Sequence, residues 1–206
     1  TPDPSATVAP TAAAYPLTLI DDEGTTVVLP AQPRKIVSLT PATTELVFAL
    51  GAGDRLVAGT DFDDFPPEAV ALPDVATFTS VDVEQIATLG ADLVLAGGNS
   101  FNPPAAIEQL RRLGIPVLVL YAPDVEGVLA DIELVGRAIG EEAGTRAMTD
   151  AMRAAFAGVE RAVEGRPRPR VFYELDATQE IFGPADDSFI AEMIVLAGGE
   201  AITTGS

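Results

Sequence analysis

The side chains best suited to binding chemistry in this 206-residue sequence are aromatic residues in short loop segments. The chain contains only nine Phe and three Tyr, and five of them fall in loops expected at 61–65, 77–80, 97–101 and 173–178. These five are Phe62, Phe65, Phe78, Phe101 and Tyr173. Aromatic faces on loops suit a large flat ligand such as a corrin or porphyrin ring. The alternative is that each ring folds over the core of its own domain.

Acidic and amide side chains accompany the rings in these loops. Asp61, Asp63 and Asp64 lie in the segment DFDDFPP, and Asn99 and Asp176 lie in two of the other loops. The carboxylates could accept hydrogen bonds from amide groups of a ligand, or contact a hard cation through oxygen. The spacing matches no calcium loop, and solvated turn chemistry is the other interpretation. We expect Asp61, Asn99 and Asp176 to contact a ligand.

Composition excludes several classes of function. The chain has no Cys and no His, which removes disulfides, thiol nucleophiles, Ser-His-Asp triads and histidine-ligated metals. The formal net charge of −19 opposes binding to nucleic acid or to an anionic membrane surface. A hydrolase with paired carboxylates, Asp63–Asp64 or Glu174–Asp176, stays open, although no neighbouring group fixes an acid and a base. A surface adhesin or interaction domain is a further alternative.

Strand and helix signals alternate through the first 124 residues. Residues 15–29 are typical of a β-hairpin with a turn at DDEG. Short apolar runs then predict buried strands at 35–39, 55–58, 92–96 and 116–121. Thr40–Pro41 supplies an N-cap and a proline at the first helical position. The alternation predicts an α/β fold with a parallel sheet, whose loops converge where the strands end.

A long helix and part of a second lobe are expected in the remainder. Apolar residues spaced 4, 3 and 4 predict one buried helical face from Val125 to Glu164, broken or bent near Gly140 and Gly144. A strand at 170–175 and a helix that begins after Ser188 are too few elements for a stable lobe. The expected domains are a disordered linker at 1–14, an α/β lobe at 15–124, an interlobe helix at 125–165 and an incomplete lobe at 166–206.

An ordered series of segments resembles one protein family. KIVSLTPATTELVFALGAGDRLV, DFDDFPPEA and LPDVATFTSVDVEQIATLGADLVLA are similar to the first lobe of the helical-backbone, class III substrate-binding proteins of ABC importers. LRRLGIPVLVLYAPDVEGVLADIELVGRAIG continues the match, and RVFYELD and SFIAEMIVLAGGEAI resemble the start of the second lobe. This family binds cobalamin, haem and siderophores. The resemblance implies two Rossmann-like lobes joined by a long helix, with ligand held between the lobes and no catalysis.

The resemblance also implies partners. In this family a Glu in the pattern P-x-x-T-E-L docks onto an Arg of the transmembrane permease, and Glu45 occupies that position. Glu200, in L-A-G-G-E, matches the counterpart on the second lobe. The family is extracytoplasmic and needs no cofactor. The Thr-, Pro- and Ala-rich residues 1–14 are then expected to act as a tether to a lipid anchor upstream.

The expected ligand is a small-molecule metal chelate. The four candidate loops contain no Lys or Arg, so a neutral or cationic ligand suits them better than an anionic ferric chelate. A cobalamin-type corrinoid is favoured on this ground, with a ferric siderophore or haem as the alternative. The absence of His counts against haem, although Tyr121 and Tyr173 could ligate iron.

Overall fold

A computed structural model describes residues 14–98, 101–178 and 180–203 of the chain. These residues form two compact units. The first holds the described residues up to Tyr121 together with Ile132–Arg146, and the second holds the rest. Asn99 and the linker predicted at 1–14, apart from its last residue, lie outside the described residues.

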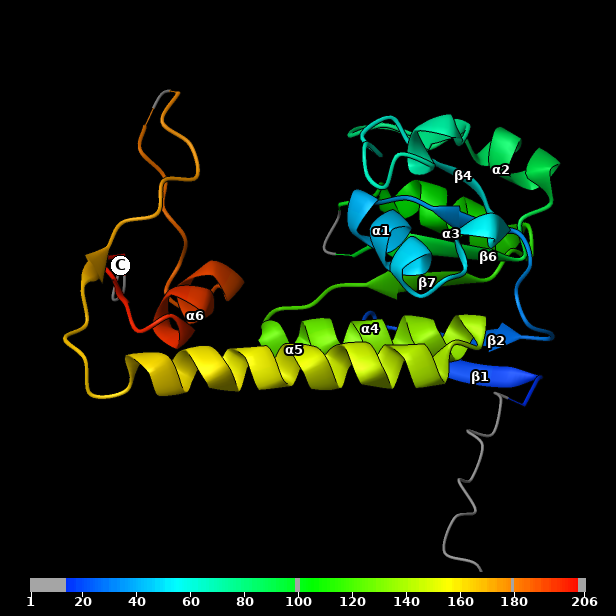
Figure 1. Ribbon diagram of the computed structural model, residues 1–206. Helices are drawn as coiled ribbons and strands as arrows, with labels where there is room; N and C mark the ends of the chain where they lie inside the picture. The colour runs from blue at the N-terminus through cyan, green and yellow to red at the C-terminus, as the bar shows by residue number, and fades with distance from the viewer. Residues whose placement is uncertain (1–13, 99–100, 179, 204–206) are drawn as a thin grey trace, which may run out of the picture. The chain divides into compact units, whose positions relative to one another are not determined.

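A five-stranded parallel sheet forms the centre of the first unit (Figure 1). Its strands lie in the order β5-β4-β3-β6-β7, and every neighbouring pair is parallel. They are β3 (Ile36–Ser38), β4 (Leu56–Thr60), β5 (Asp74–Ala76), β6 (Leu93–Gly97) and β7 (Val117–Leu120). Most of their residues are buried, as in a sheet that is covered on both faces. The α/β fold class predicted from the alternating pattern is confirmed.

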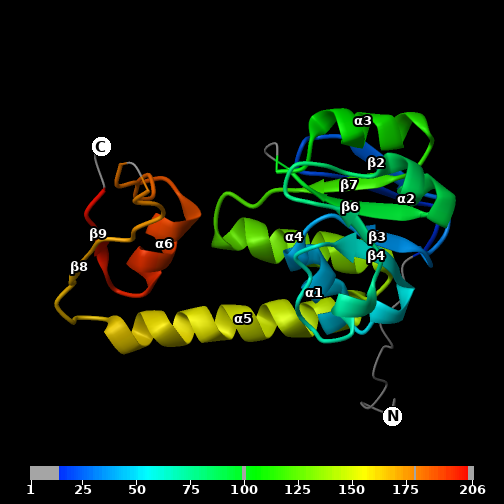
Figure 2. The same cartoon turned by 90° about the horizontal axis from the view of Figure 1, so that it is seen from above.

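Three α-helices and two short 3₁₀ turns connect these strands (Figure 2). They are α1 (Pro41–Ala49), η1 (Gly53–Arg55), η2 (Ala69–Ala71), α2 (Val83–Leu89) and α3 (Pro104–Arg112). Ile86 of α2 and Leu110 of α3 are fully buried in one cluster with Val37 and Val94 of the sheet. The side chain of Thr40 accepts a hydrogen bond from the backbone N–H of Thr43, so α1 begins with the predicted cap.

The predicted hairpin is present and is fastened to the sheet. Strands β1 (Leu17–Ile20) and β2 (Thr26–Leu29) pair antiparallel. Asp21, in the turn between them, is buried, and its Oδ2 accepts hydrogen bonds from Arg111 Nη2 at 3.0 Å and from the backbone N–H of Val119 at 3.3 Å. The turn of the hairpin therefore lies against β7, at the edge of the sheet.

The helical stretch predicted at 125–165 is broken at Gly140, one of the two glycines where a break or bend was expected, so it does not form one continuous interlobe helix. Two helices, α4 (Val125–Ile139) and α5 (Glu142–Val163), occupy this stretch. Gly140 ends α4 in a left-handed conformation, with φ of +78°. Gly136 lets α5 approach closely, since a Cβ at this position would lie 1.8 Å from Thr145 Oγ1. The chain therefore reverses at Gly140, and the two helices pack against each other (Figure 1).

The end of α4 belongs to the first unit, beyond the lobe boundary predicted at residue 124. Three side chains donate hydrogen bonds to its last carbonyls: Tyr15 Oη to Ala138 O at 2.9 Å, Gln32 Nε2 to Ile139 O at 2.8 Å and Arg55 Nη1 to Ile139 O at 2.7 Å. These bonds satisfy carbonyl groups that a helix end leaves unpaired. The helix end is therefore an integral part of the first unit.

The second unit contains few strands. Helix α6 (Phe189–Leu196) begins after Ser188, whose side chain caps it as predicted. Strand β8 (Arg170–Val171) pairs parallel with β9 (Glu200–Ala201), so the strand predicted over 170–175 is confined to two residues. A small hydrophobic cluster of the second unit is formed by Ala191, Ile194 and Ala201, with Val171 and Ile190 packed against them.

Candidate ligand-binding edge and docking cavity

Four aromatic rings of the first unit follow the ends of four of the five strands of the sheet. Phe62 follows β4, Phe78 follows β5, Phe101 follows β6 and Tyr121 follows β7, and all four are exposed. The carboxyl ends of parallel strands meet at one edge of a sheet, which is where ligands bind in open α/β folds. We call these four residues the aromatic edge. Their exposure argues against the alternative that each ring folds over its own core.

Close contacts hold part of the aromatic edge together. The rings of Phe78 and Phe101 meet edge to face, with centroids 6.2 Å apart and planes at 80°. Two glycines leave space for the neighbouring side chains. A Cβ at Gly97 would lie 2.9 Å from Phe101, and a Cβ at Gly98 would lie 2.9 Å from Tyr121. Tyr121 was not among the ring positions predicted from the loops, although it ends the apolar run PVLVLY. Its position as the last residue of a strand pattern was the available signal.

The three Asp residues of DFDDFPP have different environments. Asp61 and Asp64 are exposed, whereas Asp63 is buried and accepts hydrogen bonds from two threonines. Within the described residues, no three His, Cys, Asp or Glu side chains gather in a way that would hold a metal ion. The Asp63–Asp64 pair is not arranged for acid–base catalysis either, because Asp63 is engaged by protein donors.

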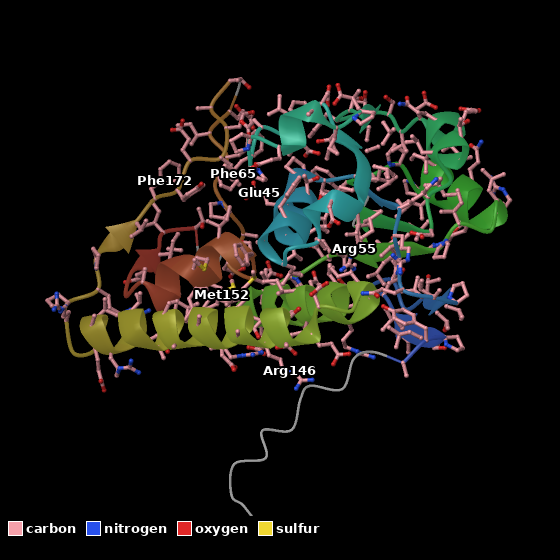
Figure 3. All side chains as sticks on the ribbon, turned by 45° about the vertical axis from the view of Figure 1, so that its right-hand side comes forward. Glu45, Arg55, Phe65, Arg146, Met152 and Phe172 are labelled. Carbon is pink, nitrogen blue, oxygen red and sulfur yellow. The ribbon has the colours of Figure 1, made fainter. Side chains whose placement is uncertain are left out.

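Phe65 and Glu45, predicted for different roles, line one cavity of about 630 Å³ in the first unit (Figure 3). Phe48 of α1 contributes a second ring, and the carboxylates of Asp54 and Glu68 complete an acidic rim. Gly53 leaves space for the ring of Phe48, since a Cβ there would lie 2.1 Å from it. We call this the Glu45 cavity. None of the described residues that line it is basic.

The second unit places its predicted site residues on exposed segments. Tyr173, Asp176 and Glu200 are all exposed. Asp176 accepts hydrogen bonds from the backbone N–H and the hydroxyl of Thr178 at 2.9 and 3.0 Å, and these bonds lower the pKa of its carboxyl group. Glu200 lies in β9, where its N–H donates to Pro169 O. The contacts of the described residues in this unit do not assign Tyr173, Asp176 or Glu200 a ligand, so their roles stay predictions.

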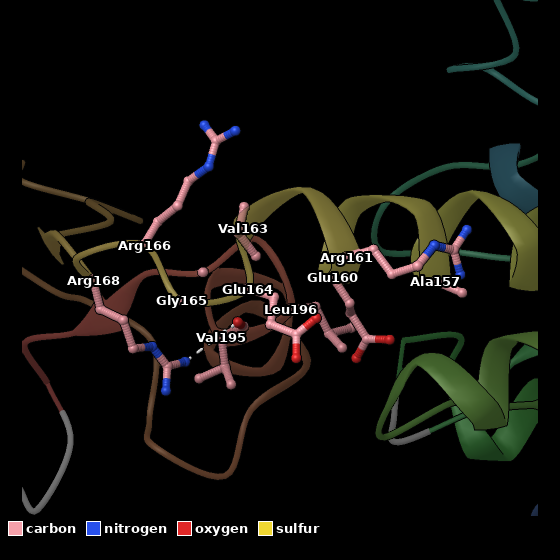
Figure 4. A pocket seen from close by; sticks show the side chains of 11 residues that line it. Ala157, Glu160, Arg161, Val163, Glu164, Gly165, Arg166, Arg168, Val195 and Leu196 are labelled. Atoms are coloured by element: carbon pink, nitrogen blue, oxygen red, sulfur yellow. Dashed lines mark hydrogen bonds between the residues drawn. The ribbon is translucent and has the colours of Figure 1, made fainter.

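A second cavity, of about 460 Å³, lies between the end of α5 and the end of α6 (Figure 4). Glu160, Glu164, Arg166 and Arg168 supply charges of both signs, and Arg168 Nη2 donates a hydrogen bond to Val195 O at 3.3 Å. None of the residues predicted for binding or docking lines it. With mixed charges and an internal hydrogen bond, this cavity has no evident preference for a ligand.

Comparison with known proteins identifies the family. Residues 36–206 match the profile of the family described as periplasmic binding protein. The chain belongs to this family. It is 32% identical over 181 residues to a vitamin B12-binding protein of Yersinia pestis, covering 86% of this chain and 63% of that protein. It is also 32% identical over 185 residues to YvrC of Bacillus subtilis, an uncharacterized ABC transporter substrate-binding lipoprotein, covering 87% of this chain and 59% of YvrC.

Solved structures show the same fold. The vitamin B12-binding protein BtuF of Vibrio cholerae matches with a TM-score of 0.74 and 28% identity, over 85% of this chain and 68% of that one. The heme-binding protein BhuT, in complex with two hemes, matches with a TM-score of 0.73 and 27% identity, over 84% of this chain and 68% of that one. The class III binding-protein fold and the family resemblance are therefore confirmed.

The chain spans between 59% and 63% of the length of the curated relatives described above. Among the described helices, none combines the length and apolarity needed to cross a bilayer.

Proposed function

We propose that this protein captures a corrinoid of the cobalamin type and delivers it to the permease of an ABC importer. The observation that carries the proposal is the aromatic edge, with four exposed rings at the ends of four parallel strands. Exposed rings in a free protein leave apolar surface in water, and a flat macrocycle would cover it. The names of two relatives, a vitamin B12-binding protein and BtuF, agree with this ligand.

Charge favours a corrinoid over the alternatives. The loops of the aromatic edge carry no Lys or Arg, and the whole chain has a net charge of −19. An anionic ferric chelate would approach an unfavourable potential. Haem is the second candidate, because relatives include heme-binding proteins and the exposed Tyr121 offers a phenol oxygen at the aromatic edge. Asp61, Tyr173 and Asp176 remain proposed ligand contacts.

Absorption spectroscopy separates these ligands. The full-length protein would be titrated with cyanocobalamin, haemin and a ferric hydroxamate siderophore in turn. We expect a saturable spectral change with cyanocobalamin. Saturation with haemin alone would assign the haem function, and saturation with the ferric hydroxamate alone would overturn the charge argument. Mass spectrometry of ligand that co-purifies with the protein provides an independent check.

We propose that the Glu45 cavity receives an arginine side chain of the permease, and that Glu200 provides the second docking contact. A guanidinium group pairs with carboxylates and stacks on aromatic faces. The Glu45 cavity offers both, with Glu45, Asp54 and Glu68 at its rim and the rings of Phe48 and Phe65 in its lining. This geometry supports a docking role for Phe65 in place of the ligand contact predicted from its loop.

The proposed location is extracytoplasmic, with a lipid tether upstream of residues 1–14. The Thr-, Pro- and Ala-rich composition of that segment suits a flexible tether, and YvrC is named a lipoprotein. Metabolic labelling of the full-length precursor with a radioactive fatty acid tests the tether. Label that is absent from the mature protein would contradict this part of the proposal.

A further inference from the structure

The carboxylate of Asp63 is buried and has three hydrogen-bond donors. Asp63 is 7% exposed. Its Oδ2 accepts from Thr44 Oγ1 at 2.9 Å and from the backbone N–H of Thr60 at 2.8 Å, and its Oδ1 accepts from Thr60 Oγ1 at 2.9 Å. All three donors are neutral. A buried carboxylate is costly unless it is hydrogen-bonded, so this arrangement needs a structural or functional explanation.

The backbone around Asp63 is shaped for this contact. A Cβ at Gly59 would lie 2.1 Å from Asp63 Oδ2, so the carboxylate occupies space that only a glycine leaves open. The backbone N–H of Thr60 can only donate, so it requires an acceptor, whereas the hydroxyls of Thr44 and Thr60 can donate or accept. The site therefore suits a carboxylate, which accepts from all three groups.

Local turn chemistry explains only part of this network. The bonds from Thr60 close a loop of three residues, as Asp side chains commonly do. Thr44 is different, because it lies nineteen positions away, on α1, and is fully buried. The bond from Thr44 therefore joins two separate elements of the fold.

These two elements carry the two surfaces described above. Asp63 lies directly after Phe62 of the aromatic edge and two residues before Phe65 of the Glu45 cavity. Thr44 directly precedes Glu45 on α1. A single buried hydrogen bond thus connects the loop that bears Phe62 and Phe65 to the helix that bears Glu45.

We infer that Asp63 is a positioning residue, whose carboxylate fixes the 61–66 loop to α1 and so holds the aromatic edge and the Glu45 cavity in one geometry. The roles of these two surfaces rest on the proposed function, whereas the link between loop and helix does not. When the link is cut, the loop should loosen while the sheet and α1 stay folded. A residue with only a general structural role would lower stability without singling out this loop.

Thr44→Val cuts the link while it keeps the shape of the side chain. Thr44→Ser keeps the hydroxyl and should restore the wild-type behaviour. Thr43→Val is the matched control, because Thr43 is a buried threonine of the same helix whose hydroxyl bonds to Ser38 and Thr40 and not to the loop. All three variants would be made in the full-length protein and compared by melting temperature and by hydrogen exchange.

The amides of Thr60, Phe62 and Asp63 report on the loop, since each donates a hydrogen bond within it. We expect their exchange to become about tenfold faster or more in Thr44→Val, and to stay close to wild type in Thr44→Ser and Thr43→Val. Equal acceleration in the two Val variants, or no acceleration in Thr44→Val, would overturn the inference.

Ligand binding gives the functional measurement. With cyanocobalamin as the probe, Thr44→Val should weaken the affinity several-fold more than Thr43→Val, because Phe62 is no longer held in place. Unchanged affinity, in a protein that binds cyanocobalamin, would refute a positioning role toward the aromatic edge. If the wild type binds no cyanocobalamin but the loop still loosens only in Thr44→Val, the link stands and the proposed ligand is wrong.

Discussion

The exposed ring of Phe78 gives the sharpest test of the aromatic edge. Phe78 is 71% exposed, and a Phe side chain presents roughly 150–250 Å², so roughly 100–180 Å² is open to a ligand. If a flat ligand covers one face, about half of this area is buried, which at about 25 cal/mol per Å² is about 1.3–2.2 kcal/mol. Phe78→Ala should therefore raise the Kd for the corrinoid about ten- to fortyfold.

The same exposure predicts a small effect on folding. Less than a third of the Phe78 ring is buried, so the free energy of unfolding should fall by about 1–1.5 kcal/mol, against about 3–5 kcal/mol for a fully buried Phe. Leu110→Ala provides the opposite pattern, because Leu110 is fully buried in α3. It should lower the free energy of unfolding by about 2–5 kcal/mol and leave the affinity of the folded protein unchanged.

Phe65→Ala is the matched control for ring exposure. Phe65 is also exposed, but it lines the Glu45 cavity. Its removal should spare the affinity for cyanocobalamin and weaken docking to the permease. Affinity would be measured by absorption titration and stability by urea unfolding on the same samples. A Phe78→Ala protein with wild-type affinity and a strongly reduced stability would show that this ring belongs to the core.

The other predictions concern docking and the frame of the first unit. Glu45→Gln combined with Glu200→Gln should leave ligand affinity intact and reduce ligand transport in reconstituted vesicles, and added salt should weaken the wild-type complex through screening; undiminished transport by the double variant would refute this docking pair. Asn102→Ala should lower the free energy of unfolding by about 2 kcal/mol in urea, because the half-buried N–H of Gly97 and the buried carbonyl of Leu39 would both lose the partner that Asn102 provides. Arg55→Ala should lower the free energy of unfolding by about 1–3 kcal/mol in the same assay, since Arg55 pairs with Glu141 and donates a hydrogen bond to the last carbonyl of α4. An unchanged urea midpoint in the Asn102 or the Arg55 variant would contradict the contact that this variant removes.

Local sequence signals predicted the frame of the first unit well. The run PVLVLY predicted a strand at 116–121, and β7 occupies Val117–Leu120. Thr40 and Pro41 predicted the start of α1, where the cap is observed. Both features depend on residues that are close in the sequence, so their physical causes were visible in the sequence itself.

Features that depend on distant contacts were not predictable in this way. Gly140 indicated that the helical stretch is interrupted, but the reversal of the chain there depends on the packing of Thr145 on Gly136, which no local signal shows. Asp61, Asp63 and Asp64 are chemically alike, and a donor on α1 distinguishes Asp63. Phe65 follows the same strand as Phe62, yet it lines the cavity beside Glu45.

Buried polar side chains anchor two of the loops that carry the aromatic edge, in addition to the contact between the rings of Phe78 and Phe101. Asp63 fastens the loop after β4, and Asn102 fastens the loop after β6 by accepting from the N–H of Gly97 and donating to Leu39 O. Because the rings are exposed, a change of ring alters folding stability little, whereas a change of anchor leaves buried groups unpaired. If the aromatic edge binds a flat ligand as proposed, the rings would select the ligand and the anchors would set the positions of the rings. We therefore expect that substitutions at Phe62, Phe78 or Phe101 change ligand preference while the sheet that carries them stays folded.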